Sequence, residues 1–347
     1  MHEQPCMTYT VETIKQSEDW DAFVKKQQYT PFVQSPSYGS FYASLGEKQI
    51  LLGVYVGQTL VGGCQVVSVH AKRGNFLYLP YGPIAEPADF PVVLRELTDY
   101  LRNNFKQYHF IRVSPFIDDT PEHKRLFSDL GYKDAPTHVL AETTWLLALQ
   151  SEDQMLADMK KNHRNLIRRC QRELVRVDVR TDNDALAAFN ELHDITARRH
   201  RFRRFSRQYI EKEFHAFAAI DQASVYLGYL PDGRLDSAAI IMTYGNMAAY
   251  RHGASLGLDK KLPTSYLVQW DALCRARKNG VSWYNFWGIA PEGSAKTHPF
   301  FGITHFKKGF GGMQKNLLHC QDLPLSHFYA LNWSVETFRN AIRGFDV

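Results

Sequence analysis

One order of secondary-structure elements occurs twice in this sequence, and this repetition limits the possible folds more than any other feature. Residue periodicity predicts a hairpin, a strand, a helix and a strand at residues 50–56 and 60–69, 76–81, 89–104, and 109–114. The same order returns about 170 residues later, at residues 223–230 and 235–244, 247–253, 263–278, and 281–289. The copies share topology rather than residues, which predicts two similar domains.

This order of elements is similar to the core of GNAT-type acyltransferases. The resemblance implies an α+β fold of tandem duplicated GNAT-like domains, with mixed sheets flanked by helices and no coiled-coil arm. GNAT enzymes hold the pyrophosphate of acyl-CoA on an R/Q-x-x-G-x-G/A loop before a helix. Neither copy has this loop, because residues 79–90 read LPYGPIAEPADF and residues 252–265 read HGASLGLDKKLPTS. The sequence therefore disfavours acyl-CoA as the donor.

Composition sets the class of protein. The 347 residues have room for two domains, and 44% hydrophobic with 22% charged residues is typical of a globular chain. The cysteines lack CxxC spacing, which indicates neither a metal site nor a disulfide framework: Cys6, Cys64, Cys170, Cys274 and Cys320. The N-terminal residues lack an apolar signal region, so we expect a cytoplasmic protein, either free or peripheral at the inner face of the membrane.

Residues 283–312, WYNFWGIAPEGSAKTHPFFGITHFKKGFGG, contain the strongest candidate for chemistry. The aromatic run at residues 283–289 predicts a strand buried on both faces, and residues 289–299 read as a polar loop. Phe306 and Lys307 then precede three glycines in four residues, and glycine allows close approach of the backbone. Phenylalanine would partly desolvate the ammonium and strengthen its interaction with an oxyanion. The alternative is a solvated lysine in a bulged strand.

YNFWGI and HFKKGFGG at this spacing resemble the Fem (FemABX) family, the aminoacyl-tRNA-dependent peptidyltransferases of peptidoglycan bridge synthesis. The family typically carries a YDFxGI-like strand and an FKxGFGG segment, and Asn285 replaces the usual acidic residue. The matching residues are Tyr284, Phe286, Gly288, Ile289, Phe306, Lys307, Gly309, Phe310, Gly311 and Gly312. Near the N-terminus, further matches to QS-x-x-W-G and Y-x-P-x-GP are Gln34, Ser35, Gly39, Tyr78, Pro80, Gly82 and Pro83, with Tyr38 at the tryptophan position.

The resemblance implies that Lys307, with Phe306, polarises the donor carbonyl while the acceptor amine attacks directly. No serine or cysteine nucleophile motif is present, so we expect no covalent intermediate. His252 and His305 are candidate proton acceptors. The residues expected to bind substrate are Tyr38, Tyr81, Arg204, Arg207, Tyr209, Tyr250, His252, Tyr284 and His305. No metal or other cofactor is indicated, and aminoacyl-tRNA is the implied co-substrate.

Two basic clusters lie between the copies. A helix predicted at residues 152–174 carries Lys160, Lys161, Arg164 and Arg168, and the family's K-x-x-R-x-x-I-R pattern is matched by Lys161, Arg164, Ile167 and Arg168. Residues 197–209 form the second cluster, in which Phe205 and Ser206 replace an Arg-Ser pair of the family, so Arg204 or Arg207 would substitute. Each basic run alone is explained equally well as a solvent-exposed face without a binding role. Together, with interleaved aromatics, they favour a surface for tRNA phosphates or an acceptor diphosphate.

We expect domains at residues 1–150 and 151–318, and a C-terminal segment, 319–347, whose helix packs back on the first domain. That helix, residues 325–343, is amphipathic through Phe328, Leu331, Val335, Phe338 and Ile342. The span 152–214 is too short for the helical arm of some Fem enzymes, which suggests a compact monomer. The predicted function is aminoacyl transfer to the stem peptide of a UDP-linked or lipid-linked peptidoglycan precursor. The alternatives are a GNAT-like N-acyltransferase with a non-cell-wall acceptor and a non-enzymatic polyanion-binding module.

Overall fold

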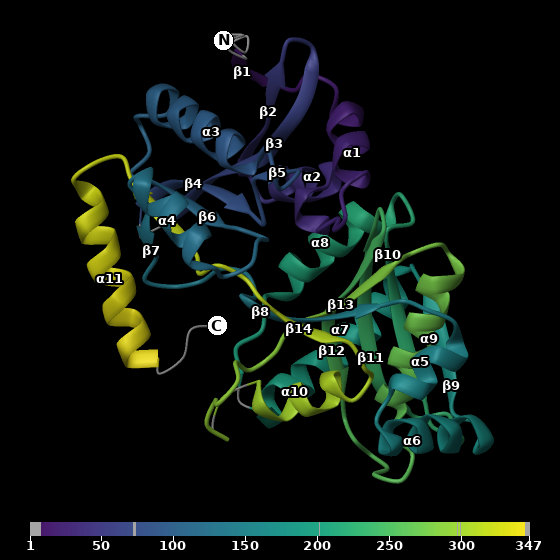
Figure 1. Cartoon of the computed structure of the whole chain (residues 1–347). Helices are drawn as coiled ribbons and strands as arrows, with labels where there is room; N and C mark the ends of the chain where they lie inside the picture. The colour runs from purple at the N-terminus through teal and green to yellow at the C-terminus, as the bar shows by residue number, and fades with distance from the viewer. Residues whose placement is uncertain (1–7, 72–73, 201, 297, 299, 344–347) are drawn as a thin grey trace. The chain divides into compact units, whose positions relative to one another are not determined.

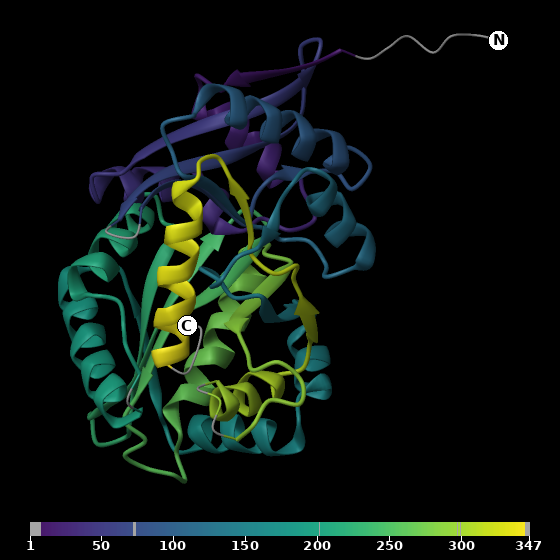
Figure 2. The same cartoon turned by 90° about the vertical axis from the view of Figure 1, so that its left-hand side faces the viewer.

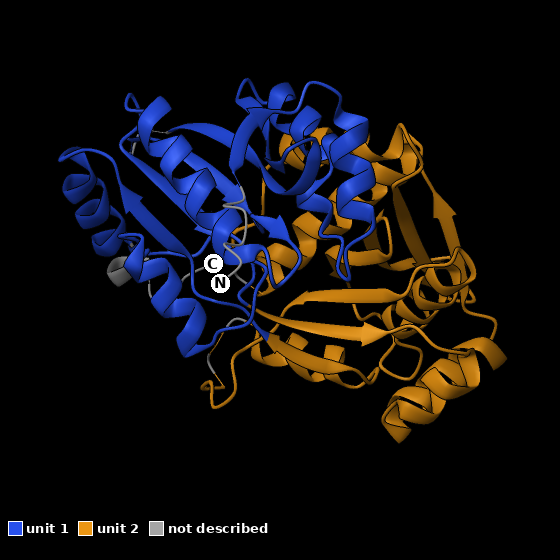
Figure 3. Ribbon diagram, turned by 45° about the horizontal axis from the view of Figure 1, so that its top comes forward, with its two compact units in different colours: residues 1–142, 316–347 blue, residues 143–315 orange. Residues whose placement is uncertain are grey.

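The chain folds into two compact units in the computed structural model, which describes residues 8–71, 74–200, 202–296, 298 and 300–343 (Figure 1; Figure 3). Unit 1 comprises residues 1–142 and 316–347, and unit 2 comprises residues 143–315. The first boundary lies before residue 150 because strand β8 (Thr143–Ala148) pairs with strand β13 (Trp283–Gly288), which belongs to unit 2. Cys6 lies outside the described residues, and the other four cysteines are free.

Unit 1 is built on one mixed sheet. The strand order is β1 (Tyr9–Thr13), β2 (Lys48–Val56), β3 (Thr59–Ala71), β4 (Gly74–Pro80), β6 (Phe110–Ser114), β15 (Gln321–Pro324) and β7 (Lys133–Asp134), with β5 (Ile84–Ala85) paired to β3. The helical segments are α1 (Ser17–Lys25), η1 (Phe32–Gln34), α2 (Pro36–Ser44), α3 (Phe90–Asn104), α4 (Pro121–Asp129) and α11 (Phe328–Arg343). The apolar stripe of α3, which includes Val93, Leu97 and Leu101, packs on the sheet and forms the core.

Unit 2 repeats this architecture. Its sheet has the order β14 (Met313–Asn316), β8, β13, β12 (Met247–Ser255), β11 (Leu235–Tyr244), β10 (Ala223–Tyr229) and β9 (Arg176–Arg180). The helices are α5 (Glu152–Asp158), α6 (Lys161–Arg172), α7 (Asn183–His200), α8 (Arg207–Ala218), α9 (Thr264–Lys278) and α10 (Phe301–Lys308). Leu267, Trp270 and Leu273 of α9 pack in the core with Tyr284 and Phe286 of β13.

The predicted duplication is confirmed. The segment β2-β3-β4-α3-β6 of unit 1 corresponds to β10-β11-β12-α9-β13 of unit 2, and in each case the helix connects two parallel strands. The next strand in each sheet comes from across the chain. Strand β8 directly follows unit 1 in sequence but pairs in unit 2, and β15 follows unit 2 but pairs with β6 in unit 1. The chain therefore enters unit 2 at β8 and returns to unit 1 before β15, so unit 1 is built from two separate segments of the sequence.

Two predicted segments differ in structure. The helix expected at residues 152–174 is interrupted at Met159, whose ψ of 150° is extended, so it forms the separate helices α5 and α6. Arg164 stabilises this break, because its Nη1 donates to the free carbonyls at the end of α5, those of Leu156, Ala157 and Met159, at 2.8–2.9 Å. Residues 301–308 form helix α10 rather than a bulged strand, and Lys307 in it is buried rather than solvated.

Helix α11 contacts unit 1 through a different face from the one that its apolar pattern predicts. The predicted stripe is exposed, with fractional exposures of 50% for Phe328, 64% for Leu331 and 67% for Phe338. The side chain of Ile342 lies outside the described residues. The buried face is polar instead and includes Glu336, which pairs with Arg112 of β6 at 2.7 Å.

Arg112 is the centre of a buried charge cluster in unit 1. Its guanidinium binds both oxygens of Asp322 on β15 at 2.7 and 2.8 Å and also pairs with Glu336. All three side chains are at most 3% exposed, and the guanidinium also lies 5.1 Å from the ring centre of Phe110. One cation therefore neutralises carboxylates from two segments that come from the C-terminal part of the chain.

Replacement of Arg112 by methionine should destabilise the protein by about 3–5 kcal/mol, because two buried carboxylates lose their cation. Urea unfolding followed by circular dichroism measures this loss. Glu336→Gln is the matched control, since it retains the pair between Arg112 and Asp322 and should cost much less. Equal losses of unfolding free energy for the two variants would show that the ion pair between Arg112 and Asp322 contributes little to stability.

His319 forms a second ionic link in unit 1. Its Nδ1 lies 2.8 Å from Glu142 Oε2, and its Nε2 lies 2.9 Å from the carbonyl oxygen of Ala135. Both neighbours are acceptors, so the doubly protonated ring satisfies both contacts. Burial alone would lower the pKa of His319, but Glu142 and the Ala135 carbonyl raise it to about 9.

The stability contributed by His319 should therefore be fully present below its unfolded pKa of about 6.5 and decline as pH rises through about 9. The free energy of unfolding of the wild type should fall across this window more steeply than that of His319→Gln. Urea titrations at several pH values, with proton NMR of the His319 ring, measure both quantities. Parallel pH profiles for the two proteins would contradict the assignment.

Candidate active site

The parallel strands β12 and β13 of unit 2 pair over a short length and then part. Their register covers three pairs, from Met247 with Trp283 to Ala249 with Asn285. In unit 1 the equivalent strands β4 and β6 remain paired over five positions, up to Pro80 with Ser114. Strand β12 has a further register shift against β11 beside Arg251. Unit 2 therefore differs from unit 1 at the point where its central parallel strands separate.

Asn285 stabilises the irregular end of β13. Its side-chain oxygen accepts the backbone N–H of Trp287 at 2.7 Å and the hydroxyl of Thr144 at 2.5 Å. Trp287 consequently adopts a left-handed conformation with φ 65°, and the register with β8 shifts between Asn285 and Gly288. The oxygen of asparagine thus supplies the acceptor that an acidic residue would supply at this family position.

Lys307 on α10 extends to this separated pair of strands. Its Nζ donates to the carbonyl oxygen of Gly288 at 2.5 Å and lies 5.8 Å from the ring centre of Tyr250 on β12. The residue is 6% exposed, and burial lowers its pKa to about 7. Among the residues that the structure describes, no carboxylate forms an ion pair with Lys307. Its amine therefore has hydrogens available for a further acceptor.

The glycines of FKKGFGG allow this close packing. A Cβ atom on Gly309 would lie 1.9 Å from the His163 ring, and one on Gly312 would lie 2.3 Å from the Leu146 carbonyl oxygen. Gly311 and Gly312 both have positive φ, 86° and 97°, and turn the chain from α10 into β14. Glycine is thus required at these positions by backbone approach and by conformation.

Phe306 has a packing position in this arrangement. Its ring lies 5.0 Å from that of Tyr266 and 5.2 Å from that of Phe310, at the edge of the core of unit 2. The backbone oxygen of Phe306 accepts from Nε2 of His163 at 3.0 Å. Phe306 therefore fixes helix α10, whereas Lys307 presents its amine between the strands.

A buried charged cluster involves Arg251 and His252, the two residues that follow Tyr250 on β12. Glu213 of α8 pairs with Arg251 at 2.9 Å and with Nε2 of His252 at 2.9 Å. Burial would raise the pKa of Glu213, but Arg251 and His252 outweigh it and hold the value at about 2. The Arg251 guanidinium lies between the rings of Phe205 and Trp287, at 5.4 and 5.3 Å. Arg251 thus connects the second basic cluster to the end of β13.

His252 is a neutral imidazole at this position, because burial lowers its pKa. Since Glu213 can only accept, Nε2 of His252 carries the proton and Nδ1 carries the lone pair. His193 of α7 lies beside it, with ring centres 6.0 Å apart, and burial lowers the pKa of His193 to about 3. In the described part of the chain, Nδ1 of His193 has no hydrogen-bond partner. No sequence motif marks His193, so sequence analysis missed it.

Arg204 and Arg207 are both paired within the protein. Arg204 contacts Asp194 and donates to the Asn190 side chain at 2.6 Å, while Arg207 donates to Asp194 at 2.8 Å. Arg204 is 10% exposed and Arg207 is 51% exposed, so Arg207 is the one accessible to a phosphate. Ser206 between them accepts from the Tyr209 N–H at 3.1 Å and caps α8.

The other predicted substrate residues lie at varied depths. Tyr38 and Tyr81 are buried in unit 1, and Tyr284 is buried in unit 2, where its hydroxyl donates to Gln269 at 2.9 Å. His305 is exposed on α10, and Tyr209 stacks on Phe205 with ring centres 4.5 Å apart. The structure places Lys307 beside Tyr250, and it separately places His252 beside Phe205, on which Tyr209 stacks. The three buried tyrosines take packing positions.

The first basic cluster is divided by the break before α6. Lys160, Lys161 and Arg168 are exposed, whereas Arg164 is partly buried and holds the end of α5. The surface formed by Lys160, Lys161 and Arg168 is called the α6 basic face below. No acidic residue occurs between Lys160 and Arg172, so this face is uniformly cationic.

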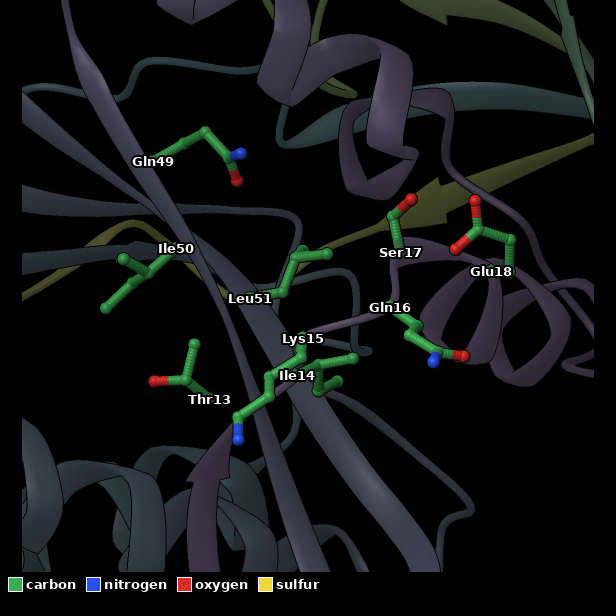
Figure 4. Close-up of a pocket in the computed structure, with 9 residues that line it drawn as sticks. All are labelled: Thr13, Ile14, Lys15, Gln16, Ser17, Glu18, Gln49, Ile50 and Leu51. Atoms are coloured by element: carbon green, nitrogen blue, oxygen red, sulfur yellow. The ribbon is translucent and has the colours of Figure 1, made fainter.

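A surface depression of about 440 Å³ lies in unit 1 (Figure 4). It is lined by the end of β1, the first residues of α1, the residues between them and part of β2: Thr13, Ile14, Lys15, Gln16, Ser17, Glu18, Gln49, Ile50 and Leu51. None of the predicted site residues lines it. In the described ranges, no group of three His, Cys, Asp or Glu side chains is placed to hold a metal ion. The separated strands of unit 2 remain the candidate site.

Comparisons with known proteins agree with this architecture. Residues 15–126 match the model of the FemAB family, and residues 157–308 match that of the acetyltransferase (GNAT) domain. A search of curated proteins gives no match. Within the described residues, no helix combines the length and apolar character needed to cross a membrane.

Solved structures show the same fold over nearly the whole chain. The crystal structure of FemX aligns with 94% of this chain and 100% of its own, with TM-score 0.83 and 17% identity. L-PGS from Bacillus licheniformis aligns with 92% of this chain and 96% of its own, with TM-score 0.55 and 13% identity. A tandem GNAT protein from the clavulanic acid biosynthesis pathway aligns with 92% and 99%, with TM-score 0.51 and 12% identity. The chain is built from two GNAT-like domains and matches the FemAB family over its first domain, and these matches support a transferase.

Proposed function

We propose that this protein transfers an aminoacyl group from aminoacyl-tRNA to an amine of the stem peptide of a peptidoglycan precursor, either UDP-linked or lipid-linked. The observation that carries the proposal is the buried amine of Lys307, which has one described carbonyl partner and lies where β12 and β13 part. The FemAB family match over residues 15–126 and the shared fold with FemX support the same class of reaction.

The reaction needs a stabilised oxyanion and a deprotonated amine. In the proposal, Nζ of Lys307 donates to the carbonyl oxygen of the donor ester, in a site where burial strengthens the interaction. The acceptor amine attacks the carbonyl carbon, a tetrahedral intermediate forms, and its collapse expels the ribose hydroxyl of the tRNA. The amine proton has to pass to a base and then to the leaving oxygen. The described contacts of His252 are with Glu213 and the aromatic rings of α7 and Phe205, so they do not assign this role to His252.

The start of α9 argues against acyl-CoA as the donor. GNAT enzymes bind pyrophosphate before the corresponding helix, but here the carboxylate of Asp236 lies at that position. It accepts from the hydroxyl of Thr264 at 2.7 Å and from the backbone N–H of Leu258 at 2.7 Å, and it is fully buried. A fixed negative charge there would repel a second anion. This supports a donor that binds elsewhere.

The α6 basic face supplies a surface for the tRNA donor in this proposal. Its cations are exposed at the start of α6 and along it, and no acidic residue lies between Lys160 and Arg172. Such a surface neutralises backbone phosphates and releases counterions, which gives affinity without sequence specificity. Specificity for the amino acid would then come from the aminoacyl end near Lys307 rather than from α6.

The test of the reaction is transfer of a radiolabelled amino acid from charged tRNA to UDP-MurNAc-pentapeptide. Lys307→Met should lower turnover by about 10²- to 10³-fold, because the oxyanion loses its donor. Lys308→Met is the matched control, since Lys308 faces the Trp145 ring at 5.1 Å and should keep activity. Normal activity of Lys307→Met, or transfer from acyl-CoA but not from tRNA, would overturn the proposal.

Lys307→Met should fold normally, because methionine replaces a buried amine without loss of volume. A melting temperature at or above that of the wild type separates a catalytic role from a structural one. The wild-type kcat/KM should decrease above about pH 7, since the donor is the protonated amine and the pKa of Lys307 in the free enzyme is about 7. Residual activity of Lys307→Arg should lack this decrease, because arginine stays charged.

The triple variant K160Q/K161Q/R168Q should bind tRNA more weakly. The slope of log affinity against log salt concentration should fall by about 2 to 3, as three phosphate contacts are lost. Filter binding at several salt concentrations measures this slope. The matched control removes the same charges from exposed positions of unit 1, as K26Q/K106Q/R125Q. Equal slopes for the two triple variants would show that tRNA binds through net charge and not through α6.

A further inference from the structure

Helix α11 is held on unit 1 by polar contacts. The Tyr329 hydroxyl donates to Asp322 at 3.2 Å, the Asn332 side chain lies 3.0 Å from Nδ1 of His109, and Glu336 pairs with Arg112 at 2.7 Å. These three side chains of α11 are between 3% and 8% exposed. The orientation of the helix is therefore fixed by charge and hydrogen bonding, and its apolar residues have to face elsewhere.

Helix α11 is the yellow helix that faces the viewer in Figure 2. Its solvent-exposed side is apolar. Phe328, Leu331, Val335 and Phe338 are 40–67% exposed, and Trp333 is 42% exposed. These five residues are a third of the fifteen exposed large hydrophobic residues of the described chain, on a helix of 16 residues. Apolar surface concentrated in this way marks an interaction site. The four residues Phe328, Leu331, Val335 and Phe338 are called the α11 stripe below.

The charge pattern of α11 identifies the kind of partner. The one charged residue between Phe328 and Phe338 is Glu336, and it is buried against Arg112. Every exposed side chain in this span is therefore uncharged, and the next charged residue, Arg339, is cationic. A soluble protein partner is usually met by a surface whose rim is polar. An uncharged helical face with phenylalanine and tryptophan matches the interface of a lipid bilayer.

The size of the stripe argues against a second copy of the chain. A helix of 16 residues is about 24 Å long, and a stripe about 10 Å wide would cover about 240 Å² per partner. Stable protein interfaces cover about 800 Å² per partner. A bilayer has no such requirement, since apolar side chains enter it individually. In the described residues no helix can span a membrane, so α11 would lie in the interface plane.

We propose that α11 docks this protein on the surface of a lipid bilayer through the α11 stripe and Trp333. The helix lies parallel to the membrane, while Arg112 and Asp322 hold it on unit 1. Aminoacyl transfer is not required for this binding, so the inference stands or falls separately from the proposed reaction. If both hold, a lipid-linked acceptor would be delivered to an enzyme that is already at the membrane.

Vesicle flotation tests the proposal with the full-length protein. The vesicles are phosphatidylcholine alone, and equal parts of phosphatidylcholine and phosphatidylglycerol. The wild type should float with both, and Phe328→Ser with Phe338→Ser should reduce binding by about tenfold or more, because two large apolar side chains no longer insert. The control variant, Leu174→Ser with Ile220→Ser, removes residues that are 79% and 55% exposed in unit 2 and should float like the wild type.

Trp333 supplies an independent readout of insertion. Brominated lipid should quench part of the tryptophan fluorescence of the wild type, and Trp333→Phe should remove that part while retaining flotation. Flotation restricted to anionic vesicles and unaffected by the stripe variants would overturn the proposal in favour of binding by surface charge. Absence of flotation, or a concentration-dependent dimer that the stripe variants abolish, would also overturn it.

Discussion

The side-chain oxygen of Asn285 maintains the irregular end of β13 on which the candidate site depends. By accepting from Trp287 and Thr144, it replaces ladder hydrogen bonds that the strand gives up as it leaves β12. The left-handed Trp287 stacks on Arg251, and the Gly288 carbonyl that follows receives the amine of Lys307. Without this acceptor, two buried donors would be unpaired and regular pairing of the strands would compete.

The duplication explains why one unit carries the candidate chemistry. Both units have a parallel strand pair connected by a helix, but in unit 1 the pair stays closed up to Pro80 and Ser114. Arg112 in the centre of β6 is committed to Asp322 and Glu336, so its charge stabilises the fold. In unit 2 the corresponding strands part, and Lys307 has no carboxylate partner among the described residues. Unit 2 also has a buried cation that is paired, Arg251 with Glu213, and it differs from unit 1 in carrying Lys307 as a second buried cation.

Sequence alone predicted the repeated elements well, because alternation and helical periodicity depend on local burial. β11 was predicted to the residue, and α9 within one residue. The break at Met159 was missed because it depends on Arg164 binding carbonyls seven and eight residues away. The Fem resemblance singled out Lys307, whereas His193 belongs to no motif and acquires its surroundings from tertiary packing. A sequence pattern identifies individual candidate residues, but it does not predict which residues the tertiary structure places next to each other.

Helix α11 shows how buried charge can override an amphipathic pattern. Burial of its stripe against unit 1 would remove apolar area from water, worth roughly 25 cal/mol for each Å². To bury the stripe, the helix would have to rotate about its axis. Glu336 would then be exposed and Arg112 would have one carboxylate fewer, and separation of a buried pair costs about 3–5 kcal/mol. Asn332 and Tyr329 would lose their partners as well. The polar face therefore determines the orientation, and the apolar face is available to whatever covers it.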